Sequence, residues 1–380
     1  MSGVRVVRRL AEIDAVAWDA LAGDHDPFVE HAFLAWLEDS GCVGGRSGWE
    51  PCHLVIEDTR GLRAAAPTYA KRNSHGEYIF DWGWADAAWR AGIPYYPKLT
   101  HAIPFTPAGG ARMLSRPGED APALRRALAE ASWDRARATD APGDHWLFCA
   151  EDEQRALEDA GWIARASFQY HWFNEGYASF DDLLERFVSR RRKEVRRERR
   201  QAASAGLALA VEPASALSAA DHGQLWRCYR STIDQHGAIP YLTERWWRGL
   251  GERLGHRAIV ATARRDGGIV AMALAFHKGE QLFGRYWGAL EQVPSLHFEL
   301  CYYQLIDYAI RHGVRRVEAG AQGEHKVARG FEPTLTRSAH RLAHAGLADA
   351  VRMFVERERE HVQRAMASMA EHLPFRQEER

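Results

Sequence analysis

The sequence predicts an α/β protein with two tandem copies of one unit, each a mixed β-sheet flanked by helices, plus a C-terminal helix. Three observations support this prediction. The length of 380 residues exceeds the roughly 150 that one domain needs, similar segments recur in order, and the second half alternates strands with helices. We expect the first unit over residues 1–175, the second over 176–347, and a C-terminal helix and tail over 348–380.

The internal repeat depends on three pairs of segments. Two hairpin-like stretches end at Lys71 and Lys278. Residues 76–84 then match 279–287 as a strand at an offset of 203, and residues 159–171 match the segment ending at His340 at an offset of 169. Their common order indicates a duplication rather than chance.

The fall in offset predicts an insert of about 34 residues in the first copy, between about 87 and 120. This segment is rich in proline, glycine and aromatic residues and lacks a helical period. A long irregular insert is typical of a lid or binding loop. We expect Tyr95, Tyr96 and Lys98 in it to cover an acceptor substrate.

The second copy shows the elements in order. Helices are predicted at 218–237, 242–255 and 298–313, and strands at 258–264, 268–277, 281–290, 315–322 and 336–343. In the last of these helices, Phe298, Cys301, Leu305 and Tyr308 fall at helical spacing and predict a buried stripe. A hairpin, strand, helix and strand around a mixed sheet are typical of the GNAT acyltransferase superfamily.

Composition excludes several classes of protein. With 46% hydrophobic and 27% charged residues, the chain is neither disordered nor fibrous. No apolar run approaches the roughly 18 residues of a membrane span, and the N-terminus lacks the apolar core of an export signal. Five scattered cysteines without a CxxC pair indicate free thiols, so we expect a cytoplasmic protein without disulfides or zinc.

Only five of the 50 basic residues are lysines. Codon bias explains most of this arginine excess. A lysine that persists is then enriched for positions where a guanidinium cannot substitute for a compact ammonium. Lys98 and Lys326 are of particular interest, because both fall at the proposed cleft.

The candidate catalytic residues lie in a glycine-punctuated loop where the first copy has an amphipathic helix, 150–161. Loops at strand ends commonly carry functional sites. The loop contains Glu318, Gln322, Glu324, His325, Lys326 and Arg329, and we expect Arg285, Tyr286, Trp287, His297 and Glu299 to contribute to substrate binding. The His-x-Glu pair lacks a third ligand, so no metal is predicted.

A basic helix is predicted over residues 180–206, with Leu184, Val188 and Val195 as a narrow apolar stripe. Its wide cationic face carries Arg190, Arg192, Lys193, Arg196, Arg197, Arg199 and Arg200, while Glu194 and Glu198 lie away from it. Because the net charge is only −1, this is a local patch. It predicts a polyanionic partner: RNA, a pyrophosphate-linked precursor, or the head groups of an anionic membrane.

The segments FDWGWADA, YYPKL, PFTPAGGARM, RRRKEVRRER, GRYWG, LHFELCYYQ and EAGAQGEHKVARGFEP together resemble the FemAB-like proteins of the GNAT superfamily, over residues 26–357. The resemblance implies tandem GNAT architecture. It also implies cytoplasmic transfer of an amino acid from aminoacyl-tRNA to an amine of a cell-wall peptide precursor. The basic helix at 190–200 resembles one that opens the second unit of these proteins, and Lys326 is the nearest match to a lysine linked to the reacting ester or tetrahedral intermediate.

The sequence also bears on the acyl donor. GNAT acetyltransferases hold the pyrophosphate of CoA on the backbone of a glycine-rich helix start. The corresponding linker, 290–299, has no glycine and contains Pro294, which lacks a backbone N–H. Acyl-CoA is therefore disfavoured as donor against aminoacyl-tRNA, and no resident cofactor is predicted.

The sequence thus predicts acyl transfer from an ester or thioester to an amine. Lys326 would stabilise the oxyanion, with Arg285 as a second candidate for this role, and Glu324, His325 or Glu318 would act as the base. Two alternatives remain open: a CoA-dependent N-acetyltransferase, and a non-catalytic module that binds a cell-wall precursor or RNA.

Overall fold

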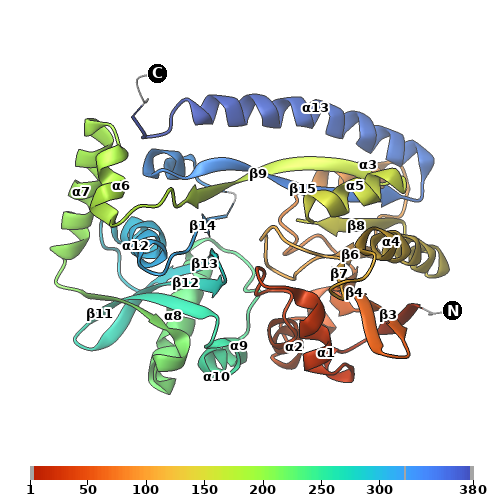
Figure 1. Ribbon diagram of the computed structural model, residues 1–380, viewed down its shortest axis with the longest axis horizontal. Coiled ribbons are helices and arrows are strands. Elements are labelled where there is room, and N and C mark those ends of the chain that lie inside the picture. The colour runs from red at the N-terminus through yellow and green to blue at the C-terminus, as the bar shows by residue number, and fades with distance from the viewer. Residues whose placement is uncertain (1–3, 321, 377–380) are drawn as a thin grey trace. The chain divides into compact units, whose positions relative to one another are not determined.

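The computed structural model describes residues 4–320 and 322–376, which form two compact units (Figure 1). The first contains the chain up to Ser167 together with Leu335–Gln363, and the second contains Phe168–Thr334 and the residues from Arg364 onward. These units divide the chain differently from the expected ranges 1–175, 176–347 and 348–380. The reason is that two strands and the C-terminal helix contribute residues to both units.

The first unit has two sheets. One has the strand order β1-β3-β4-β7, and in the other β2, β5, β6 and β8 are followed by the end of β15. Pro67, which cannot donate to a strand ladder, separates β4 from β5. The elements are β1 (Val4–Val7), α1 (Ala15–Ala22), α2 (His31–Asp39), β2 (Trp49–Pro51), β3 (His53–Asp58), β4 (Gly61–Ala66), β5 (Thr68–Lys71), α3 (Trp82–Arg90), β6 (Lys98–His101), β7 (Leu114–Ser115), α4 (Ala121–Ala138), β8 (Gly143–Leu147), α5 (Glu151–Asp159) and β9 (Ile163–Phe173).

The second unit has one sheet, in the order β10-β11-β12-β13-β14, followed by the end of β9. Neighbours are antiparallel except β13 and β14, which run parallel. Its elements are α6 (Phe180–Arg186), α7 (Ser189–Ala203), β10 (Ala208–Pro213), α8 (Ala219–Gln235), α9 (Glu244–Arg248), α10 (Leu250–Leu254), β11 (Ala258–Arg265), β12 (Gly268–Lys278), β13 (Gln281–Ala289), α11 (Leu296–Phe298), the π-helical turn η4 (Glu299–Tyr303), α12 (Gln304–Arg311), β14 (Arg316–Glu318) and the 3-10 helix η5 (Glu324–Arg329). Strand β15 (Glu332–Leu342) and helix α13 (Ala345–Ala370) complete the chain.

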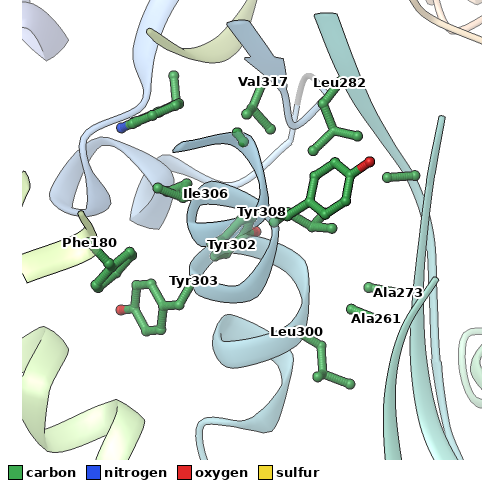
Figure 2. Packing of buried hydrophobic residues seen from close by; sticks show 14 of the residues in the cluster. Phe180, Ala261, Ala273, Leu282, Leu300, Tyr302, Tyr303, Ile306, Tyr308 and Val317 are labelled. Carbon is green, nitrogen blue, oxygen red and sulfur yellow. The ribbon is translucent and has the colours of Figure 1, made fainter. Parts of the chain in front are cut away.

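The core of the second unit surrounds the helix that follows β13. Figure 2 shows Leu300, Tyr302, Tyr303 and Ile306 on this helix, with Ala261 and Ala273 of two sheet strands beside it. Small alanines on β11 and β12 let the helix approach the sheet closely, and Phe180 of α6 packs against Tyr303 from another side. The helix after β13 is therefore held in the core by the sheet and by α6.

The tandem arrangement predicted from the repeat is confirmed. The offset of 169 superimposes β9 on β15, and both strands are eleven residues long. In each unit a strand is followed by a helix and then by a strand parallel to it: β6, α4 and β8 in the first unit, and β13, α11–α12 and β14 in the second. The fold is therefore two tandem GNAT-like units.

The match of 76–84 with 279–287 was wrong. Residues from Trp82 form helix α3, and the first-unit counterpart of β13 is β6, which lies inside the expected insert. The insert is therefore not a lid of irregular structure, because β6 is fully buried between β5 and β8. The sequence Lys-Leu-Thr-His shows no apolar pattern, and the strand is nevertheless buried, with Lys98 and His101 hydrogen-bonded to buried partners.

The basic helix predicted over 180–206 is two helices, α6 and α7, separated at Phe187 and Val188. Phe187 is buried and forms a β-bridge with Phe375, and the backbone N–H of Val188 donates to the carbonyl of Pro374 at 2.7 Å. These contacts with the chain's C-terminal segment hold the two residues in an extended conformation. Val188 is consequently 40% exposed rather than part of the predicted apolar stripe.

None of the helices in the described part of the chain combines the length and apolarity that crossing a membrane requires.

Candidate active site

A cavity opens in the second unit where two parallel strands separate. β13 pairs with β14 only along Gln281–Phe283, although β13 continues to Ala289. A β-bulge shifts the register of β12 and β13 here, so that Leu274 lies opposite Tyr286 and Ala275 lies opposite Gly284. The cavity has a volume of about 470 Å³ and is lined by Ala273, Leu274, Gly284, Arg285, Tyr286, Trp287, His297, Cys301, Tyr302, Leu305, Ala319, Gln322, Gly323, His325 and Lys326.

One wall of the cavity is the helix that follows β13. The helix starts after Ser295, a non-glycine residue with a φ of +63°, whose hydroxyl donates to the side chain of Gln201 at 2.9 Å. The next turn, Glu299–Tyr303, is π-helical, and its adjacent residues Cys301 and Tyr302 both reach the cavity. Such turns recur at functional sites in α-helices.

Lys326, in η5, supplies a cation to the lining of the cavity. Its side chain is almost fully buried, and Nζ donates to the carbonyl oxygens of Gln322 and, at 3.4 Å, Gly320. Burial lowers the pKa of Lys326 to about 8, partly opposed by the Cys301 thiol. The lysine is therefore mainly cationic at neutral pH but close to titration.

Two histidines flank this lysine. The ring of His297 faces that of His325 at a centroid distance of 6.2 Å, and the hydroxyl of Tyr302 lies 2.9 Å from Nε2 of His325. Burial lowers the pKa of His297 to about 4 and lowers that of His325, and the cations Lys326 and Arg329 add to both effects. Both imidazoles are thus neutral at pH 7, and a neutral imidazole can accept a proton.

The family model for FemAB-like proteins, described as peptidoglycan biosynthesis/recognition, matches residues 9–377. The chain belongs to the FemAB-like family. No curated protein matches it.

Solved structures show the same fold. The C-terminal domain of an Agrobacterium fabrum protein assigned as a lysylphosphatidylglycerol synthetase is 13% identical, with a TM-score of 0.57, over 90% of this chain and 95% of that one. FemX is 12% identical with a TM-score of 0.56, over 90% of this chain and 98% of its own. L-PGS from Bacillus licheniformis is 11% identical with a TM-score of 0.52, over 88% and 98% of the two chains. The family model thus assigns this chain to the FemAB-like proteins, and the solved structures show that its fold is shared.

Seven of the residues predicted for the site in this FemAB-like chain come together around the cavity: Arg285, Tyr286, Trp287, His297, Gln322, His325 and Lys326. They come from β13, from the start of the following helix, and from η5 with the loop before it, which are separate along the chain. The divergence of β13 from β14 brings them to one space.

The predicted carboxylates lie elsewhere among the described residues. Glu318 pairs with Arg316 at 3.0 Å on β14, and Glu324 is exposed on η5. Glu299 is buried in the π-helical turn and accepts hydrogen bonds from Arg199 at 3.2 Å and Gln304 at 2.8 Å. Of the three bases considered from the sequence, His325 is the one among the residues that line the cavity.

Arg329 is likewise directed away from the cavity. Its guanidinium contacts Glu198 at 2.6 Å, the Tyr303 hydroxyl at 3.0 Å and the carbonyl of His325 at 2.7 Å. It also lies 3.6 Å from the ring centroid of Phe298. Arg329 therefore stabilises the η5 segment, and its charge is used within the protein rather than for binding a substrate.

Tyr95, Tyr96 and Lys98 belong to the first unit and lie in or beside a buried charge cluster. Nζ of Lys98 contacts Asp81 and, at 2.8 Å, Glu77, and the Tyr95 hydroxyl donates to Asp81 at 2.7 Å. Burial opposes the charge of Lys98, but the two carboxylates outweigh it and raise the pKa of this lysine. None of the three predicted residues lines the second-unit cavity.

Helix α7 presents most of its predicted cations to solvent. Arg190, Lys193, Arg196, Arg197 and Arg200 are exposed. Arg192 is half-buried, and Arg199 turns inward to pair with Glu299 and to lie over the ring of Phe180. The outer face of α7 is therefore a compact cationic surface formed by the five exposed residues.

A second cavity of about 410 Å³ adjoins the first and shares Trp287 and His297 with it. Its other lining residues are mostly neutral and polar or apolar, and come from the end of α8 and the linker 289–296: Thr232, Gln235, His236, Ala289, Glu291, Gln292, Val293, Pro294 and Leu296. Glu291 in this lining is paired with Arg265 at 3.0 Å.

Sequence reasoning missed Tyr302 as a residue of the site. The spacing predicted Cys301 as part of a buried stripe, and Tyr302, four residues after Phe298, lies beside that stripe on a regular helix. Periodicity alone does not distinguish a core position there from one that lines a cavity. The π-helical turn, which periodicity does not reveal, places both residues at the cavity.

Proposed function

We propose that the protein transfers an aminoacyl group from aminoacyl-tRNA to an amine of a cell-wall peptide precursor, in the second-unit cavity. The observation that carries this proposal is Lys326, a buried ammonium with its pKa lowered to about 8, beside a neutral histidine at the separation of two parallel strands. An ester donor is already activated, so the protein needs mainly to align the reactants and stabilise charge.

In the proposed reaction, Lys326 stabilises charge and His325 transfers a proton. The amine nitrogen attacks the ester carbonyl carbon, and the carbonyl electrons move to oxygen as an oxyanion opposite the Lys326 ammonium. His325 accepts the proton lost by the amine and returns it to the departing 3′ oxygen of the tRNA. The products are an amide and a tRNA with a free hydroxyl group.

The outer face of α7 supports a polyanionic donor. Its five exposed cations lie on the helix whose inner side touches the wall of the cavity at Glu299 and Ser295. The helix start supports tRNA over CoA, because the linker lacks glycine, and Pro294 and Glu291 line the space beside it.

The second cavity suits a peptide-like acceptor. Amide side chains of Gln235 and Gln292 can pair with peptide groups, and Trp287 offers an apolar face. Since Trp287 and His297 line both cavities, an acceptor amine in one would lie next to a carbonyl in the other.

A single-turnover assay with labelled aminoacyl-tRNA, in parallel with labelled acyl-CoA, tests the proposal. We expect product from the tRNA donor and a loss of at least about 100-fold in Lys326→Gln, the size of effect seen when an oxyanion donor is removed. Lys278→Gln, at the end of β12 and outside the lining of the cavity, is the matched control and should keep its activity.

The other outcomes separate the alternatives. Consumption of acyl-CoA alone would indicate an N-acetyltransferase. Salt-dependent binding of RNA or precursor without product, unaffected by Lys326→Gln, would indicate a binding module. Full activity of Lys326→Gln with either donor would refute the role assigned to this lysine.

A further inference from the structure

Helix α7 contacts three parts of the active site. Glu198 contacts Arg329 at the end of η5, Arg199 contacts Glu299 in the π-helical turn, and Gln201 contacts Ser295 at the helix start. The helix after β13 and η5, which both contribute residues to the lining of the cavity, are thus attached to α7. The sequence pattern had only indicated that Glu198 lies away from the cationic face.

Glu198 makes the most buried of these contacts. Its side chain is 7% exposed and that of Arg329 is 6% exposed, and both oxygens are used, one by Arg329 and the other by the Tyr303 hydroxyl. A buried carboxylate is costly unless it is paired and fully hydrogen-bonded, as this one is. The triad of Glu198, Arg329 and Tyr303 therefore has a defined geometry.

Arg329 connects this triad to η5. Its Nη1 donates to the carbonyl oxygen of His325 at 2.7 Å, and the N–H of Phe331 donates to the carbonyl of Lys326 at 3.2 Å. η5 is a single 3-10 segment of six residues, and the hydrogen bonds of such a helix have poorer geometry than those of an α-helix. Its placement consequently depends on side-chain contacts.

We propose that Glu198 is a positioning residue, which holds His325 and Lys326 at the cavity through Arg329. The proposal rests on the function above for the roles of these two residues, but the placement of Lys326 can be measured without any activity. Without Glu198, Arg329 loses its buried partner, η5 loosens and the Lys326 ammonium gains access to water. An ammonium in water titrates near its ordinary value, roughly 10.4.

Site-resolved amine labelling tests this. Acetic anhydride reacts with neutral amines, so the rate at Lys326 against pH, followed by peptide mass spectrometry, reports its titration. We expect a midpoint near 8 in the wild type and an upward shift of at least about one pH unit in Glu198→Gln. Glu194→Gln, which breaks the half-buried pair with Arg191 on the same helix, should leave the midpoint unchanged. Lys193, exposed on α7, is an internal reference in every sample.

Tyr303→Phe is the second variant, because it removes one hydroxyl from the triad and leaves the charges paired. It should shift the Lys326 midpoint in the same direction by less, and it decides the question if Glu198→Gln does not fold. An unchanged midpoint in every folded variant would overturn the proposal. If the midpoint shifts but the wild type transfers no acyl group from any donor, the positioning stands and the proposed function falls. If transfer occurs and Glu198→Gln lowers kcat without changing KM, both stand.

Discussion

Replacing Lys326 by methionine should stabilise the folded protein at neutral pH while it removes activity. The pKa of this lysine is about 8 in the folded state against 10.5 for the free side chain. At about 1.36 kcal/mol per pKa unit, holding it charged in its buried position costs about 3 kcal/mol of unfolding free energy. Methionine fills a similar volume without this cost.

The sign of the pH dependence follows from proton binding. Between pH 8 and 10.5 the unfolded chain binds a proton that the folded protein does not, so the wild type gains stability as pH rises through this window. Below pH 8 the penalty is fully present. The advantage of the methionine variant should therefore be largest at pH 7 and shrink towards pH 10.5.

Urea denaturation of both proteins at pH 7 and pH 9.5 measures this. We expect the difference between their unfolding free energies to change by about 2 kcal/mol, since comparison within the pair cancels every other titrating group. Lys193→Met, at an exposed position, should show no such change. If the difference between the unfolding free energies of the two proteins is the same at both pH values, Lys326 is not a buried cation with a lowered pKa.

Three further predictions concern the base, the basic helix and the packing of β13. Burial and neighbouring cations lower the pKa of His325 below 6.5, so the acid limb of the pH–activity profile should lie below pH 6.5. The His325→Gln variant should lose this limb, and an unchanged limb would exclude His325 as the base. Neutralising Lys193, Arg197 and Arg200 should flatten the salt dependence of donor affinity, with the logarithmic slope falling by about 2 to 3, whereas an unaltered slope would exclude α7 as the RNA contact. Gly288→Ala should destabilise the protein by about 1–3 kcal/mol in urea denaturation, because the added methyl group would stand 2.3 Å from the backbone of α8. A variant as stable as the wild type would show that α8 can move.

The duplication and the loop that carries Lys326 could be predicted from the sequence. Both are local properties: the repeat is a comparison of segments, and the contrast between helix α5 and the loop at 318–329 is visible as a change from amphipathic spacing to glycine-punctuated polar residues. Strand β13 and the helix after it also have the apolar spacing that their buried faces require.

The errors arose where a distant partner overrides the local pattern. Strand β6 is buried although Lys98 and His101 are polar, because Glu77 and Asp81 pair with Lys98 and Asp144 pairs with His101. The same partners make Lys98 an internal charge rather than a substrate contact. The break between α6 and α7 depends on Pro374 and Phe375, far along the chain.

By itself, the sequence determined the two tandem units, the family and the short segment that carries Lys326, because each depends on residues close together in the chain. Only the tertiary structure decided which polar residues meet. It places His325 and Lys326 at the cavity, turns Glu318 and Glu299 into internal pairs, and divides α7 into an outer cationic face and an inner face with Glu198. The physical reason is that burial and pairing set the charge, the pKa and the direction of a polar side chain, and both are fixed by residues far apart in the sequence.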